Sequence, residues 1–162
     1  MVFGRPVLLL SILVNCMLSV SSQQMDNVKI EKILYVISDT LQGEPGLWQF
    51  SVGDVSMMCV TDEIHNRMRI ISPIKEMKAV TSEELNKAME ANFHSALDMR
   101  YAISDEIIWS AFIHPLQELS KDQVIDAVSQ VYNGTLTFGT SYSSTVLVFP
   151  KRKKKDLKTK KS

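Results

Sequence analysis

Three histidines are the side chains of this sequence best suited to acid–base or metal chemistry. His65, His94 and His114 lie far apart in the chain, and no HExxH or CxxC motif accompanies them, so zinc ligation has no local support. His94 falls on the polar side of a predicted helix and His114 at the end of a predicted strand, where a structural role is the usual one. A Ser-His-Asp set assembled by folding stays open, and it would make the protein a hydrolase built around His94 or His114.

Motifs that bind phosphate or present a nucleophile are absent from the sequence. The six glycines never form GxGxxG or GxxxxGK, and there is no GxSxG. We therefore predict no cofactor, no metal and no catalytic residue, and we expect a protein that is not an enzyme.

Three arginines could recognise an anionic group on a partner. Arg67 and Arg69 are two positions apart on a predicted strand, so their side chains share one face. Arg100 lies on another predicted strand, a candidate neighbour of the first. Three guanidinium groups together could bind a carboxylate or a phosphate. The alternative, also open, is a solvated sheet face on which the arginines pair with acids of the same domain.

The net charge of zero conceals an acidic body and a basic tail. Residues 23–150 carry nine Lys or Arg and seventeen Asp or Glu, whereas residues 151–162 carry eight Lys or Arg and one Asp. The tail could dock the protein on an anionic envelope surface, as in an adaptor, or it could be a solubilising disordered end. Nucleic acid is the least accessible anionic partner for an exported chain.

Export is predicted from the first 22 residues. Arg5 precedes the apolar run Val7–Leu18, and small residues follow before Gln23, which is the pattern of a cleaved signal peptide. We expect a periplasmic or secreted protein. Two alternatives stay open, an uncleaved membrane anchor and a lipoprotein attached through Cys16. Removal of residues 1–22 leaves Cys59 without an intrachain partner, and its apolar neighbours predict a buried thiol.

The body alternates helical and strand patterns. Apolar residues recur at helical spacing over Asp26–Gln42, and capping-box patterns begin two further predicted helices, Thr81–Leu97 and Ser120–Gly139. Alternating apolar residues bounded by turn residues predict strands over Leu47–Val52, Val55–Thr61, Arg67–Ile71, Met99–Ile103 and Ile107–Ile113, with a short edge strand over Tyr142–Phe149. This order, α-βββ-α-ββ-α, predicts one α+β domain with a mostly antiparallel sheet and helices packed on it.

Several short stretches resemble the bacterial type III secretion chaperone-like superfamily, which includes CesT/Tir-chaperone-like proteins. The nearest resemblance is to its uncharacterised YbjN-like members, over roughly residues 28–149. The stretches that carry it are Asn66-Arg67-Met68-Arg69-Ile70-Ile71-Ser72-Pro73-Ile74, Ala91-Asn92-Phe93, Arg100-Tyr101-Ala102-Ile103, Trp109, His114-Pro115-Leu116 and Gly139-Thr140-Ser141-Tyr142.

The resemblance implies a small acidic protein without catalytic residues, commonly a homodimer, that holds an extended segment of another protein. Secretion chaperones lack a signal peptide and a long basic tail, and this chain departs from the pattern in both. We therefore carry over a chaperone-like binding fold and not the role of an effector chaperone. The leading hypothesis is an exported chaperone-like protein that binds a polypeptide segment of a partner.

A homodimer through the second helix and its following strand is predicted on physical grounds. A domain of this size with a single sheet buries only about two-thirds of its unfolded surface, which favours an apolar patch that a second copy can cover. Met89, Phe93 and Leu97 are the candidate interface residues, with Phe93 as the anchor. The alternative is that Phe93 fills the core of the monomer.

Overall fold

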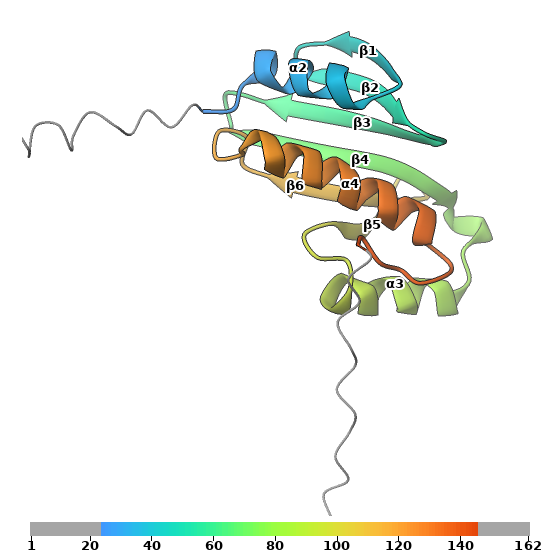
Figure 1. Cartoon of the computed structure of the whole chain (residues 1–162). Helices are drawn as coiled ribbons and strands as arrows, with labels where there is room; N and C mark the ends of the chain where they lie inside the picture. Colours follow the sequence, from blue (N-terminus) through green and yellow to red (C-terminus); the bar gives the residue numbers. More distant parts are fainter. Residues whose placement is uncertain (1–23, 146–162) are drawn as a thin grey trace, which may run out of the picture.

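Six strands form one antiparallel sheet in the computed structural model, which describes residues 24–145 (Figure 1). The strand order is β1-β2-β3-β4-β6-β5. The strands are β1 (Thr40–Glu44), β2 (Leu47–Val52), β3 (Val55–Asp62), β4 (Arg67–Glu76), β5 (Arg100–Ser104) and β6 (Ile107–His114). The predicted α+β class and the antiparallel sheet are confirmed.

Three α-helices and one 3-10 turn complete the described part of the chain. They are α2 (Asn27–Ile37), η1 (Met77–Ala79), α3 (Ser82–His94) and α4 (Lys121–Thr137). α2 and α4 lie on the same face of the sheet, and α3 lies along its β5 edge (Figure 1). No helix within residues 24–145 is long and apolar enough to cross a bilayer.

The first helix is shorter than its sequence pattern predicts, and an additional strand follows it. α2 ends at Ile37, where the hydroxyl and backbone N–H of Ser38 both donate to the Leu34 carbonyl. Leu41, which fits the helical period, instead lies in β1 opposite Phe50. One apolar residue can satisfy either period, and pairing with β2 decides in favour of the strand. The observed order is therefore α-ββββ-α-ββ-α.

Capping interactions begin α3 and α4 where the sequence predicts them. Thr81 and Glu84 form a reciprocal capping box at α3, and Ser120 and Gln123 form one at α4. Each box satisfies backbone N–H groups that the first turn of a helix leaves free. The two helices thereby start at defined positions relative to the sheet.

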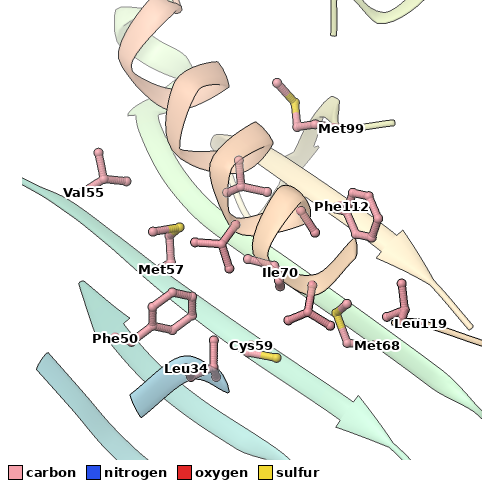
Figure 2. Packing of buried hydrophobic residues seen from close by; sticks show 14 of the residues in the cluster. Leu34, Phe50, Val55, Met57, Cys59, Met68, Ile70, Met99, Phe112 and Leu119 are labelled. Carbon is pink, nitrogen blue, oxygen red and sulfur yellow. The ribbon is translucent and has the colours of Figure 1, made fainter. Parts of the chain in front are cut away.

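The core lies between the sheet and the helices α2 and α4 (Figure 2). The inward-facing residues of the central strands alternate with outward-facing ones, as the period of a strand requires. Cys59 is fully buried among apolar residues, as predicted, and burial raises the pKa of its thiol to about 12. The thiol is therefore protonated and serves as a small apolar group.

Two predicted strand limits differ from the observed ones. β4 continues to Glu76 past Pro73, because a register shift between Pro73 and Lys75 accommodates the proline opposite β6. At the other end of the chain, residues 142–145 form no strand. The remainder of the predicted edge strand, residues 146–149, lies outside the described residues, as do the predicted signal peptide and the basic tail.

Gly134 in the middle of α4 is explained by a close approach. A Cβ at this position would lie 1.9 Å from the Cε of Met99, a fully buried residue just before β5. The Gly134 carbonyl also accepts a hydrogen bond from the Tyr101 hydroxyl at 2.9 Å. Because glycine has no Cβ, α4 can pack directly against the segment that enters β5. The cost is the low helix propensity of glycine.

Substitution of Gly134 by alanine should destabilise the protein by about 1–3 kcal/mol. The Met99 methyl group that has to move belongs to a fully buried side chain, so its displacement crowds the core by more than the gain of about 1 kcal/mol in helix propensity. Urea denaturation measures the difference. Ser129→Ala, at an exposed position of α4, is the matched control and should be neutral or slightly stabilising. Met99→Leu in the Gly134→Ala background should recover part of the loss. A stabilised Gly134→Ala variant would contradict the packing argument.

Candidate partner-binding surfaces

The three arginines predicted to bind a partner lie on one face of the sheet, opposite the helices. Arg67 and Arg69 share this face on β4, and Arg69 is paired with Ile113 of β6. Arg100 is on β5, which does not neighbour β4 because β6 lies between them. Its guanidinium donates to the backbone carbonyls of Leu97 and Met99. The three arginines therefore share a surface but do not form one compact cluster.

This surface, which we call the bare sheet face, carries no helix within the described residues. Arg69 and Arg100 are separated on it by apolar side chains, since Arg100 is paired with Ala111 and Ala111 with Ile71. Six large apolar residues face outward here, namely Leu47, Met58, Val60, Ile71, Trp109 and Ile113. An apolar surface interrupted by arginines is suited to protein contacts.

The candidate dimer residues form an exposed apolar stripe on and after α3. Met89 is 45% exposed, Phe93 87% and Leu97 39%. Phe93 does not fill the core of the monomer, which excludes that alternative. By contrast, Met99, two residues after Leu97, is fully buried and does not belong to this exposed stripe. We call Met89, Phe93 and Leu97 the α3 stripe; their role in a dimer stays a prediction.

Polar contacts fix α3 at the edge of the sheet, and they thereby determine which of its sides faces solvent. The Asn92 side chain accepts a hydrogen bond from the Tyr101 N–H at 2.7 Å and donates one to the Tyr101 carbonyl at 3.1 Å. It thus occupies the free edge of β5, which would otherwise be open to another strand. At the start of the helix, Lys75 of β4 forms an ion pair of 2.9 Å with Glu84.

A third surface is a groove of about 460 Å³ between α2 and the start of α4, which we call the α2–α4 groove. Its lining is apolar at the base and lysine-rich at the rim. The lining residues are Met25, Lys29, Lys32, Ile33, Val36, Ile37, Leu119, Ser120, Lys121 and Ile125. The groove is not predictable from the sequence, because its two walls are far apart in the chain. The spacing of Lys29 and Lys32 on one helix is the local signal that the sequence offers for it.

The arrangement of sheet and helices is similar to that of two solved complexes. The "HopA1-SchA Chaperone-Effector Complex" contains a chain that matches with a TM-score of 0.52 and 11% identity, covering 67% of this chain and 92% of the other. The "ExsC-ExsE Complex" matches with a TM-score of 0.53 and 9% identity, covering 68% and 92%. The fold of this chain is therefore similar to that of type III secretion chaperones.

No family model and no curated protein sequence matches the chain. At identities of 9% and 11%, the likeness to the two complexes concerns the fold alone. It agrees with the resemblance carried by the short sequence stretches. The chaperone-like fold is thus established by the architecture, and the binding surfaces have to be argued from this chain's own residues.

The histidines of the chaperone-like fold each have a local structural contact. His65 bonds Asp62 at 2.6 Å, in the turn between β3 and β4. His114 bonds the Pro115 carbonyl at 2.8 Å and stacks on Phe112. His94 packs edge-on against Phe93. Within residues 24–145, no group of three or more His, Cys, Asp or Glu side chains is placed to hold a metal ion.

Glu84 connects the start of α3 to the sheet, and its ionisation contributes to stability. The Thr81 N–H donates to the Glu84 carboxylate at 2.8 Å, and Lys75 lies beside it. These contacts lower the pKa of Glu84 to about 2. Because the folded pKa is below the ordinary value of about 4.3, this stability is present above pH 4.3. It is lost as the pH falls from there toward 2.

Glu84→Gln should lower the free energy of unfolding at pH 6, where it removes the ion pair with Lys75 but preserves a capping-box acceptor. The difference from the wild type should shrink below about pH 4.3 and vanish near pH 2, as urea denaturation across that range would measure. Glu90→Gln, an exposed acid on the same helix, is the control and should leave the pH dependence unchanged. If the difference in free energy of unfolding between Glu84→Gln and the wild type is the same at pH 6 and pH 2, the ionisation of Glu84 does not contribute to stability.

Proposed function

We propose that the protein is an exported, non-enzymatic, chaperone-like protein that binds a polypeptide segment of a partner. The observation that carries this proposal is the amount of large apolar surface left exposed on a chaperone-like fold. The bare sheet face, the α3 stripe and the outer side of α2 all present such side chains. Monomeric soluble proteins rarely expose large contiguous apolar patches, and such patches usually mark interaction sites.

The protein partner is supported from two directions. The two structural neighbours were solved as complexes, one of them between a chaperone and an effector. In this chain, the bare sheet face combines large apolar side chains with arginines, residue types that are enriched at protein interfaces. The hydrolase alternative has less support, since the histidines of its candidate site are engaged in local packing or backbone contacts.

A peptide array tests this function directly. The full chain, applied to an array of 15-residue peptides of varied sequence, should bind a subset that is rich in apolar residues, because main-chain and apolar contacts provide most of the affinity in such recognition. Unfolded chain and an unrelated acidic protein of similar size are the controls. Uniform absence of binding above these controls would refute the polypeptide-binding function.

A homodimer is the second part of the proposal. Phe93 lies at the centre of the α3 stripe and is the most exposed of its three residues. Burial of such an aromatic ring at a two-fold axis would explain why α3 leaves it uncovered in the monomer. Since β5 is the adjacent edge, the second copy would contact the end of the sheet as well as the helix.

Phe93→Ala should convert a dimer into a folded monomer at micromolar concentration, because central aromatic residues typically contribute about 2 kcal/mol or more to an interface. Light scattering gives the mass, and circular dichroism shows whether the fold is retained. Leu136→Ala, at an exposed apolar position of α4, is the control and should stay dimeric. A monomeric wild type, or a dimer that survives Phe93→Ala, would exclude this interface.

A further inference from the structure

The base of the α2–α4 groove is apolar and is built by two helices that the sequence separates by more than eighty residues. Ile33 of α2 and Leu119, just before α4, are buried at its base. Ile37 and Ile125 are partly buried beside them. Val36 stands at the rim and is 74% exposed. The groove is thus a formed apolar depression with a further apolar contact at its edge.

The rim is cationic although the body is acidic. Lys29, Lys32 and Lys121 line the groove, and no Asp or Glu does. Elsewhere in the described chain, Lys75, Lys78 and Lys87 are each paired with a glutamate. Lys29 is paired with Asp26, but neither Lys32 nor Lys121 forms an ion pair within residues 24–145. The groove therefore combines apolar contact area with two cations that have no ion-pair partner in the described part of the chain.

From this combination we infer that the α2–α4 groove binds a helical segment of a partner protein whose apolar stripe is flanked by Asp or Glu. This inference rests on the proposed polypeptide-binding function and deepens it. Apolar side chains at i, i+3, i+4 and i+7 would enter the groove, the mode in which amphipathic helices dock between helices. The flanking carboxylates would meet Lys32 and Lys121, which favours acidic over basic segments.

Other occupants fit the groove less well. The tail at residues 151–162 carries eight Lys or Arg and one Asp, and the groove lysines would repel it. The N-terminal apolar run Val7–Leu18 carries no Asp or Glu that could pair with these lysines. A volume of 460 Å³ lies within the range of small-molecule pockets, about 300–1,000 Å³, and a fatty acid would also match an apolar base with a cationic rim. The apolar lining, however, extends to Val36, which is 74% exposed, and a partner protein would cover this exposed side chain better than an acyl chain held at the base of the groove.

Fluorescence anisotropy with two matched peptides tests the inference on the full chain. Both are labelled 16-residue peptides with leucine at i, i+3, i+4 and i+7, one with glutamate and one with lysine at the flanking positions. The acidic peptide should bind about tenfold more tightly than the basic one at low salt, the effect expected of two exposed cations. Added salt should reduce this preference.

Two groove variants and two matched controls locate the binding. The double variant Lys32→Glu/Lys121→Glu should lose or reverse the preference, whereas Lys78→Glu, at the far end of the sheet, should preserve it. Val36→Ser should weaken the binding of both peptides several-fold. Leu136→Ser, at another exposed apolar position, should leave the binding of both peptides unchanged. All five substituted positions are exposed, and circular dichroism checks that each variant folds.

The outcomes separate this inference from the function on which it rests. If the peptide array shows binding but acidic and basic peptides bind alike, or the groove variants bind like the wild type, the groove assignment is wrong and the polypeptide-binding function stands. If the array is blank, the function itself fails. Oleate binding that Val36→Ser weakens, without binding of the acidic peptide, would assign the groove to a lipid and overturn the inference. Loss of self-association in the double lysine variant would assign it to a second copy, which also overturns it.

Discussion

The insertion of β6 between β4 and β5 is the constraint on which the exposed surfaces depend. β6 pairs with β4 from Met68 to Glu76, so β5 cannot lie beside β4. The connection from β4 must therefore pass to the far side of β6, and α3 is the segment that makes this passage. As a result, α3 packs on the sheet mainly at β5, and its other side, with Phe93, is left to solvent.

The position of α3 at the β5 edge also explains why helices cover only one face of the sheet. The polypeptide provides α2 over β1 and β2, and α4 over β3, β4 and β6, but α3 is occupied at the edge. Within residues 24–145 there is no further helix for the opposite face. An antiparallel sheet tolerates this arrangement when the uncovered face carries polar or long amphipathic side chains, and Arg67, Arg69 and Gln49 meet that condition on the bare sheet face. Where apolar residues remain on this face, a partner can cover them.

Local chemistry made much of the fold predictable from the sequence. The two capping boxes and the alternation within β2 and β3 appear in the structure where the residues indicate them, because each depends on interactions within a few positions of the chain. β1 was missed because Leu41 satisfies both a helical and a strand period, and only pairing with β2 distinguishes them. The position of Arg100 was misjudged for a related reason, since strand order depends on contacts between distant segments.

The candidate surfaces also differ in whether they can be predicted from a local sequence pattern. Met89, Phe93 and Leu97 could be selected from one helical pattern, although the sequence could not decide whether Phe93 is buried. The α2–α4 groove could not be anticipated, because Lys32 and Lys121 become neighbours of one depression only after both helices have packed on the sheet. These two surfaces lie at opposite ends of the strand order, the groove near β1 and β2 and the stripe beside β5. A contact between copies at the β5 edge would therefore leave the groove of each copy open, so that the proposed self-association and the proposed segment binding would not compete for one surface.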